Sequence, residues 1–416
     1  MTTTEPTLGA DRATELMAEL FAGKPEDPTP LYNELRELGD GVHYFGPANG
    51  YFVFRFDDDQ VVARDAAFST DFFDQAPMAI HDPSDPEHVR FVNISRRLMA
   101  FSDAPRHTAL RGLVRKAFTP NAVDRWRPTV EQAVDRLLDQ FSPGDEVDFV
   151  SQLSIDVPID AICAVLGVKE VDRPMIRAGS NGLASTFDPT IVDEARDKAI
   201  RDCLELIDSL DAVLEERRTS PEDDLISLVL ETHAEDNNGL EAADILAQIL
   251  FLVAAGNETT VNMLSGGIFH LLKYPEQRKR LQSDPSLVLS FINESLRLDT
   301  PIDIGAPRVT TQPTKFGETE VPAGSLVFQV HAAANRDPRR FDSAEELIID
   351  RHPNPQMSFN HGVHSCVGAP LARLEGEVFL TRFLERFPDF AAGAEPAALR
   401  AGHVQVRGLA SLPIRL

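Results

Sequence analysis

One long apolar segment without a proline constrains the fold of this chain more than any other feature. It begins after Gly239 and runs past Leu271. A helix that is apolar on nearly all sides must be covered by protein all around. The sequence therefore predicts a helix that crosses the interior of a large domain. Its apolar positions at helical spacing are Ile245, Leu246, Ile249, Leu250, Leu252 and Val253.

The rest of the chain is mostly helical in pattern, with a few short strands. Further helices are expected from about 191 to 217 and from about 369 to 387. No internal repeat or linker composition divides the chain. We therefore expect a mainly α fold with a small β region, in a single domain spanning residues 1–416 whose first 25 residues form a polar arm. The strands are expected at 42–45, 51–54, 308–310, 315–316 and 326–330.

Charge and cysteine content exclude several classes of protein. The chain has 416 residues and a formal net charge of −26, which repels nucleic acid and anionic membrane surfaces. It contains no apolar run long enough for a transmembrane helix, and its first residues lack a signal-peptide pattern. Three widely spaced cysteines make a disulfide framework improbable. These features predict a cytoplasmic protein that binds neither nucleic acid nor membrane.

A cysteine between two glycines gives the most specific chemical signal. Residues 359–368 have the sequence FNHGVHSCVG, and a helix is expected directly afterwards. Glycine lets the backbone approach a flat ligand, and a helix N-terminus stabilises a thiolate. A lone cysteine is more often a small buried hydrophobe. The Phe, Gly, His and Gly at these offsets instead favour Cys366 as a thiolate ligand, with Phe359 shielding the sulfur.

This loop resembles that of the cytochrome P-450 family, the haem-thiolate monooxygenases, and in particular its soluble bacterial members. The family pattern is Phe-Gly-x-Gly-x-His-x-Cys-x-Gly, and this chain departs from it at Asn360. Asparagine tolerates a positive φ better than most residues, so we expect haem binding to persist. The resemblance implies the P-450 fold, a single helix-rich domain around a buried haem b (iron protoporphyrin IX). It also implies that Cys366 binds the iron and that Phe359 and Gly368 lie beside the haem.

An acid beside a hydroxyl interrupts the long apolar helix. Residues 255–260 have the sequence AGNETT. Ala255 and Gly256 leave room for a flat cofactor, and Thr259 can donate to a carbonyl of its own helix. The alternative is an ordinary helical glycine followed by threonines. The segment resembles the family's Ala-Gly-x-Glu/Asp-Thr motif, which implies that Glu258 and Thr259 organise protons and water for O–O cleavage.

Glu294 and Arg297 are three residues apart and therefore share one face of a helix. Most such pairs are exposed and contribute little to stability. This pair resembles the family's Glu-x-x-Arg signature. The resemblance implies a buried ion-pair network that holds the cysteine loop, with Arg351 as a third partner.

A second helical pair, His107 and Arg111, carries potential anion donors on one face. Haem has two propionates, which need cationic or N–H donors. A basic pair on the surface is the alternative. The resemblance implies that His107 and Arg111 bind the propionates, and that Arg308 and His364 occupy the two other propionate-binding positions.

The resemblance implies a monooxygenase that activates O₂ and hydroxylates, or otherwise oxidises, an apolar small molecule such as a fatty acid, terpenoid, steroid or macrolide. No flavin or iron–sulfur segment is visible, so a ferredoxin and its reductase are the expected electron donors. A basic docking patch for them, or simply a solvated basic face, is expected near the cysteine loop. Its residues are Arg106, Arg115, Lys116, Arg339, Arg340 and Arg373.

Two alternative functions remain. A peroxide-driven peroxygenase of this family lacks the acid–alcohol pair, whereas this chain has Glu258 and Thr259. A non-catalytic haem sensor or carrier needs neither that pair nor a large apolar pocket. NADH-driven product formation with surrogate redox partners separates these functions.

The substrate pocket is expected to be apolar, although the same residues can equally be core. Asp303 is expected to form a turn rather than to orient a polar substrate group. The residues expected to contact substrate are Phe72, Phe91, Leu183, Phe187, Leu252, Ile302, Ile304 and Ala410.

Overall fold

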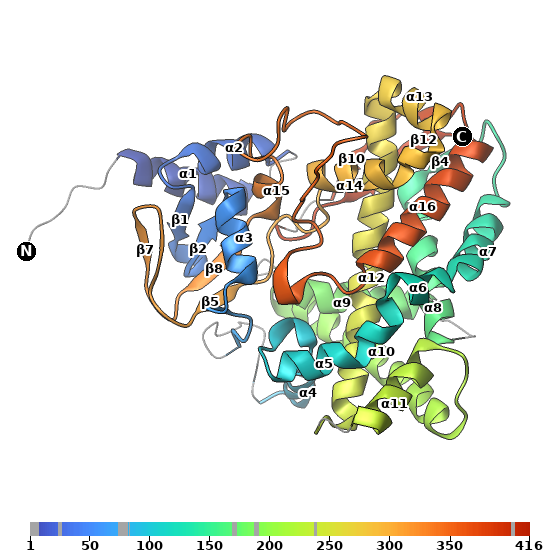
Figure 1. The fold of residues 1–416 in the computed structure, drawn as a ribbon, viewed down its shortest axis with the longest axis horizontal. Helices are drawn as coiled ribbons and strands as arrows, with labels where there is room; N and C mark the ends of the chain where they lie inside the picture. The colour runs from blue at the N-terminus through green and yellow to red at the C-terminus, as the bar shows by residue number, and fades with distance from the viewer. Residues whose placement is uncertain are drawn as a thin grey trace, which may run out of the picture.

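A computed structural model describes residues 8–23, 27–73, 82, 84–168, 173–186, 191–236, 239–400 and 404–416. Most helices gather on one side of the molecule, and a small sheet with the N-terminal helices lies on the other side (Figure 1). The mainly α architecture with a small β region is confirmed. No helix among the described residues is both long and apolar enough to cross a bilayer.

Helix α12 (Ala242–Lys273) is the long interior helix that the sequence predicts, and it stands upright through the helical part in Figure 1. A capping box at Glu241 and Asp244 begins it. All six apolar residues that predicted it are buried. It ends before Pro275, which begins the next helix, α13 (Pro275–Ser283).

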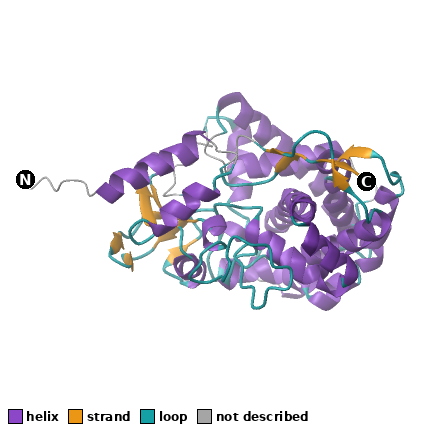
Figure 2. Ribbon diagram, turned by 90° about the horizontal axis from the view of Figure 1, so that it is seen from above, coloured by secondary structure: helices purple, strands orange, loops and turns teal. Residues whose placement is uncertain are grey.

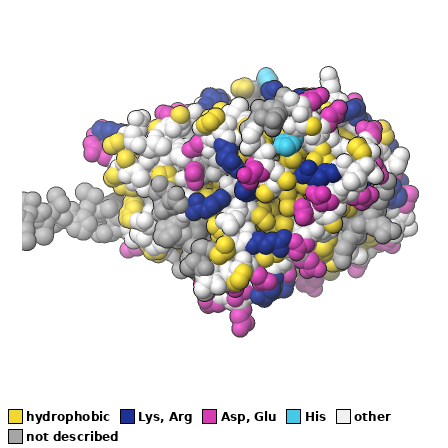
Figure 3. All heavy atoms as spheres, turned by 90° about the horizontal axis from the view of Figure 1, so that it is seen from below, with side chains coloured by type: hydrophobic (Ala, Val, Ile, Leu, Met, Phe, Trp, Pro, Cys, Tyr) yellow, Lys and Arg dark blue, Asp and Glu magenta, His cyan; other side chains and the backbone are white. Residues whose placement is uncertain are grey.

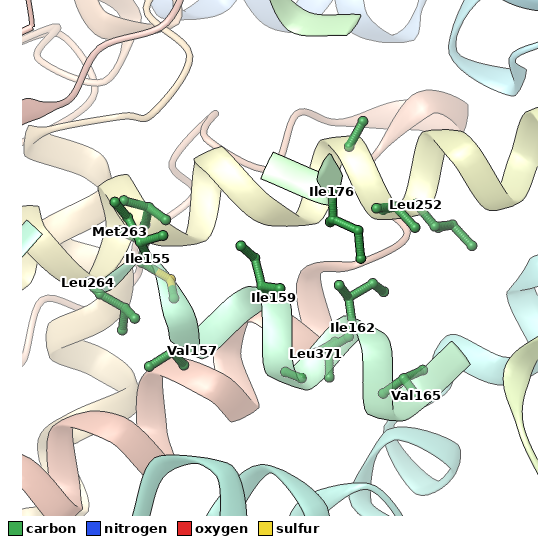
Figure 4. Close-up of a cluster of buried hydrophobic side chains, with 14 of the residues drawn as sticks. Ile155, Val157, Ile159, Ile162, Val165, Ile176, Leu252, Met263, Leu264 and Leu371 are labelled. Carbon is green, nitrogen blue, oxygen red and sulfur yellow. The ribbon is translucent and has the colours of Figure 1, made fainter. Parts of the chain in front are cut away.

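Other helices cover α12 along its length. Helix α9 (Arg173–Thr186) packs against α12 and α10 (Asp193–Thr219), and α8 (Asp156–Leu166) also contacts α12. Figure 4 shows Ile159 and Ile162 of α8 near Leu371 of α16 and beside the ribbon of α12. This apolar packing fixes the central part of α12. The remaining helices of this half are α4 (Pro86–Ser95), α5 (Arg106–Arg115), α6 (Pro120–Asp124), α7 (Arg127–Leu138), α11 (Leu225–Asp236), α14 (Val288–Leu298) and α16 (Ala369–Arg386).

The main sheet has the strand order β1-β2-β8-β5-β3. Strands β1 and β2 form the predicted hairpin, and Asn49 in its turn has a φ of 47°. Strand β2 pairs with β8 in parallel, and the other neighbours are antiparallel. The strands span Val42–Phe45 (β1), Gly50–Val53 (β2), Phe68–Ser69 (β3), Arg308–Thr310 (β5) and Leu326–Gln329 (β8).

Shorter strands form three further small sheets among the described residues, and Figure 2 shows strands near the C-terminus well away from the main sheet. Strands β10 and β11 form a hairpin, and β12 pairs with β4 and β9. The strands span Glu146–Asp148 (β4), Thr314–Phe316 (β6), Thr319–Val321 (β7), Ala391–Ala392 (β9), Ala398–Leu399 (β10), Leu409–Ser411 (β11) and Pro413–Arg415 (β12).

The expected polar arm is wrong over most of its length, because Leu8–Gly23 forms helix α1. Leu16, Met17 and Leu20 are buried, and they join a second, smaller core beside the main sheet. These three apolar residues stand beside the charged residues Glu15 and Glu19, which made the segment look polar as a whole. Three more helices lie in this half: α2 (Thr29–Glu37), α3 (Phe56–Arg64) and α15 (His331–Ala334).

Candidate cofactor and active site

The cysteine loop folds back on itself before α16 begins. The Cys366 backbone N–H donates to the Phe359 carbonyl at 2.8 Å. Asn360, where the family has glycine, has a φ of 51°, so it adopts the left-handed backbone that asparagine tolerates. Gly362 has a φ of 74°, and a Cβ there would lie 2.5 Å from the Ala63 carbonyl oxygen of α3. Only glycine fits at this position without moving α3 or the loop.

The Cys366 thiol lies just before α16 begins, close to two backbone donors. Cys366 is exposed to solvent, yet burial is the main influence on its thiol and raises its pKa. The backbone N–H groups of Gly368 and Ala369 bond to the sulfur and, with Arg111, oppose that rise. These donors would stabilise a thiolate.

A half-buried cation of α16, Arg373, packs against the first residue of the loop. The Arg373 guanidinium lies 4.4 Å from the ring centre of Phe359, and its Nε donates to Asn293 Oδ1 at 3.2 Å. Burial lowers the pKa of Arg373, while the Cys366 thiolate raises it. Arg373 therefore holds Phe359 and α14 together.

Open space also borders the middle of α12. Ala255 is exposed, although its neighbours Val253 and Ala254 are buried. A Cβ on Gly256 would meet no atom within 4 Å. Although protein covers most of α12, the face at Ala255 and Gly256 is uncovered. A flat cofactor needs such a face of small residues in order to approach the helix.

Three consecutive side chains of α12 have three different partners. Thr259 Oγ1 donates to the Ala255 carbonyl oxygen at 2.7 Å, as the sequence predicts. Glu258 forms a largely buried ion pair with Arg400, which directly follows β10. Thr260 bonds to the carboxyl of Glu375 on α16, whose pKa is raised by burial to about 8.

Sequence analysis missed Arg400 and Glu375. Both lie more than 100 residues from their α12 partners. No local spacing signals such contacts. A buried carboxyl in the apolar pattern of α16 was the only available clue to Glu375.

The four predicted propionate-binding residues come together from α5, β5 and the cysteine loop. The rings of His107 and His364 have centres 4.1 Å apart, and Arg111 Nη2 donates to Ser365 Oγ at 3.4 Å. Burial lowers the pKa of Arg308 to about 10. Burial, with Arg308 and His107, lowers the pKa of His364 to about 3.

The carboxylate near this cluster, Asp103, accepts hydrogen bonds from Ser69 and Thr70 and forms no ion pair with Arg308 among the described residues. Arg308 is only 6% exposed and has no hydrogen-bond or ion-pair partner among the described residues. A buried cation without a partner is costly. The two carboxylates of a haem would supply the missing charge, so the residues present fit that cofactor.

Glu294 and Arg297 are completely buried and form a two-pronged ion pair. Arg297 Nε donates to Glu294 Oε2 at 2.8 Å, and Nη2 donates to Oε1 at 2.9 Å. Arg351 Nε donates to the same carboxylate at 2.9 and 3.0 Å. The structure thus brings all three predicted residues together.

The same network reaches the start of the cysteine loop. Arg297 donates to the Asn335 carbonyl oxygen at 2.8 Å, and Asn335 Nδ2 donates to Ser358 Oγ at 3.0 Å. Ser358 Oγ in turn donates to the Leu296 carbonyl oxygen at 2.7 Å. The loop is therefore attached to the C-terminal end of α14.

The residues predicted to contact substrate are divided between several places. Ile304 lies in the second core with α1, and its contact with substrate stays a prediction. Ile302 is 37% exposed and forms a β-bridge with Val406. Phe187 lies outside the described residues, and Ala410 is exposed on β11. Four others belong to the main core: Phe72, Phe91, Leu183 and Leu252.

Asp303 does not form a surface turn. It is buried and accepts a hydrogen bond from the Tyr32 hydroxyl at 3.2 Å. Burial raises its pKa to about 6, although Arg407 opposes the rise. Asp303 thus belongs to a polar network within the fold.

The predicted basic patch is largely neutralised by acidic neighbours. Arg106 pairs with Asp244, and Arg339 pairs with Glu37. On the face seen from below, Lys and Arg side chains alternate with Asp and Glu (Figure 3). These contacts favour a mixed surface over a strongly basic one.

Comparisons with known proteins agree with this geometry. The family model described as Cytochrome P450 matches residues 80–391. Cytochrome P450 107B1 of Saccharopolyspora erythraea is 38% identical over 318 residues, 76% of each chain. The 6-deoxyerythronolide B hydroxylase of the same organism is 34% identical over 92% of this chain and 95% of its own. The structure of epothilone B-bound cytochrome P450epoK has a TM-score of 0.88 and 28% identity, covering 95% of this chain and 98% of the other.

Proposed function

Because this chain belongs to the cytochrome P450 family, and is a haem-iron monooxygenase, we propose that Cys366 is the thiolate that binds the iron. The observation that carries this proposal is the Cys366 thiol, which is exposed to solvent while the backbone N–H groups of Gly368 and Ala369 bond to its sulfur. Arg111 and Arg308, together with the imidazoles of His107 and His364, bind the propionates. Glu294, Arg297 and Arg351 are structural, because they attach the loop to α14.

A haem held by these residues would supply O₂ activation, in which one oxygen atom is inserted into a C–H bond and the other is released as water, with two electrons and two protons consumed. The chain's own residues organise the rest. Ala255 and Gly256 leave clearance beside α12. Thr259 and Glu258 hold and transfer the protons, since they are adjacent polar groups in an otherwise apolar helix.

For the substrate, we propose a large apolar molecule of macrolide or steroid size. Two relatives support this class by name, since one hydroxylates 6-deoxyerythronolide B and another was solved with epothilone B. Compounds of this class are expected to displace water from the iron and shift the Soret band. If only short, charged compounds gave that shift, the proposed class would be wrong.

We also propose a cytoplasmic ferredoxin and reductase as the electron source; the three free cysteines fit a reducing compartment. NADH-driven product formation with surrogate partners tests this proposal. Product formed only with added peroxide would favour a peroxygenase. Haem without turnover under either condition would favour a sensor or carrier.

Replacement of the candidate ligand tests the iron site directly. Cys366→Ala is expected to abolish the thiolate signature in the carbon-monoxide difference spectrum. Cys203→Ala, at a buried position of α10, is the matched control and should retain that signature. An unchanged spectrum in Cys366→Ala would show that another group ligates the iron.

A further inference from the structure

Among the residues that the structure describes, Arg400 is the one outside α12 that pairs with the candidate proton-transfer acid Glu258. The side chain of Glu258 is 13% exposed, and that of Arg400 is 27% exposed. An ion pair this sheltered is screened far less than one on the surface. It therefore fixes both the charge and the direction of the carboxylate.

The segment that carries Arg400 is itself attached to α12. The Arg400 backbone N–H donates to the Gly408 carbonyl oxygen at 2.9 Å, next to the β10–β11 pairing. Gly408 packs so closely on Asn262 that a Cβ there would collide with the Asn262 side chain. Positions 258 and 262 are one helical turn apart, so the hairpin contacts one face of α12 at two levels.

The other charged groups near this pair come from separate elements. Arg177 of α9 is close enough to Arg400 to lower its pKa further, after the larger effect of burial. On the opposite side, Glu375 of α16 bonds to Thr260 and not to Glu258. Among the described residues, Arg400 is thus the partner that balances the Glu258 carboxylate.

We propose that Arg400 is a positioning residue for oxygen activation, which holds the Glu258 carboxylate against the C-terminal hairpin beside Thr259. This inference rests on the proposed role of Glu258. Arg400 keeps Glu258 ionised and oriented, so that it accepts a proton from the solvent side and passes it on beside Thr259. The position of the hairpin therefore controls proton delivery.

The test compares Arg400→Gln and Arg400→Lys in the haem-loaded enzyme with surrogate redox partners. Arg400→Gln should lower product formed per NADH on the order of tenfold, with electrons diverted to peroxide. Arg400→Lys should recover part of this coupling, because it restores the charge without the planar fork. Arg415→Gln, at an exposed arginine of β12, is the control and should leave coupling unchanged.

A readout independent of turnover is the ionisation of Glu258. Difference infrared spectra, assigned with Glu258→Gln, should show its carboxyl protonating at higher pH in Arg400→Gln than in the wild type. A loss of hairpin packing alone would not produce this shift and its partial reversal by lysine.

Double substitution separates the two proposals. Arg400→Gln should have no further effect on coupling in a Glu258→Gln background. Additive effects, or normal coupling in Arg400→Gln while Glu258→Gln is impaired, would overturn the role of Arg400 only. Normal coupling in Glu258→Gln itself would instead overturn the proposed role of Glu258.

Discussion

Glu375 shows how burial and a single hydroxyl determine the charge of one side chain. It is 3% exposed on α16, and its bond to Thr260 only partly offsets the desolvation of the carboxyl. Its pKa is raised from 4.5 to about 8. The neutral form is therefore favoured in the folded protein.

This shift predicts the pH dependence of stability. An acid whose pKa is raised on folding contributes stability below its unfolded value, and that contribution is lost as pH rises toward about 8. Glu375→Gln should remove this loss, so its advantage over the wild type should grow by a few kcal/mol, in order of magnitude, between pH 5 and 8. Urea unfolding at both pH values measures it. The exposed Glu385→Gln should show no such trend, and an equal trend in both variants would contradict the assignment.

Gly362 illustrates a residue fixed by backbone geometry. Gly362→Ala should reduce haem content and lower stability by about 2 kcal/mol or more, because it combines a positive φ with a clash against the Ala63 carbonyl. Gly112→Ala is the control, since Gly112 lies in α5 with open space around its Cβ position. That control should be neutral or slightly stabilising. Haem content and thermal unfolding are the measurements, and equal behaviour of the two variants would argue against strain at Gly362.

At the scale of elements, α14 positions the chain before the cysteine loop through the hydrogen bonds of Arg297 in its last turn. The single side chain of Arg297 bonds both to the Glu294 carboxylate and to three carbonyl oxygens from the chain between β8 and the cysteine loop. The helix thereby determines where that irregular segment runs. The stability of the loop depends on this one buried guanidinium.

Arg297→Lys is therefore not a conservative change. Lysine has three donors on a single nitrogen and cannot reach the same acceptors, so the variant should lose about 3–5 kcal/mol. Arg280→Lys is the matched control, at a partly exposed arginine of α13. Urea unfolding and haem retention measure the difference. A loss below 1 kcal/mol in Arg297→Lys would show that the network is not needed.

The elements that sequence predicted well are those with strong local periodicity. Helix α12 and the β1–β2 hairpin appear where their patterns place them. The cysteine loop also has the expected left-handed Asn360. Helix α1 was missed, because only tertiary contact with β1 and its neighbours reveals which of its few apolar residues are buried. For the same reason the sequence does not show that Ile304 joins the second core, since an apolar side chain does not encode which core it joins.

At the scale of the whole molecule, the buried apolar residues form separate clusters, and the two with the most residues lie in different halves of the fold. The main core surrounds α12, whereas the second core joins α1, α2 and the edge of the main sheet. The candidate cofactor residues Cys366, His107 and Arg111 are not part of the second core. A substitution in the second core should therefore lower the free energy of unfolding without changing the haem spectra.

Met17→Ala tests this separation. Met17 is fully buried, so its truncation should lower the free energy of unfolding by about 2–4 kcal/mol. The Soret and carbon-monoxide spectra of the folded variant should be unchanged. Glu19→Ala, on the exposed face of the same helix, should alter neither property. A spectral change in Met17→Ala would mean that the two cores are coupled through the site.

The accessibility of Cys366 has a practical consequence for quantifying the loaded protein. Cys163 and Cys203 are buried, and burial raises the pKa of each thiol to about 12, so both resist alkylation. An iron-bound sulfur would resist it as well. The number of labels taken up per native chain should therefore count the molecules that lack their cofactor, from zero for full loading to one for none.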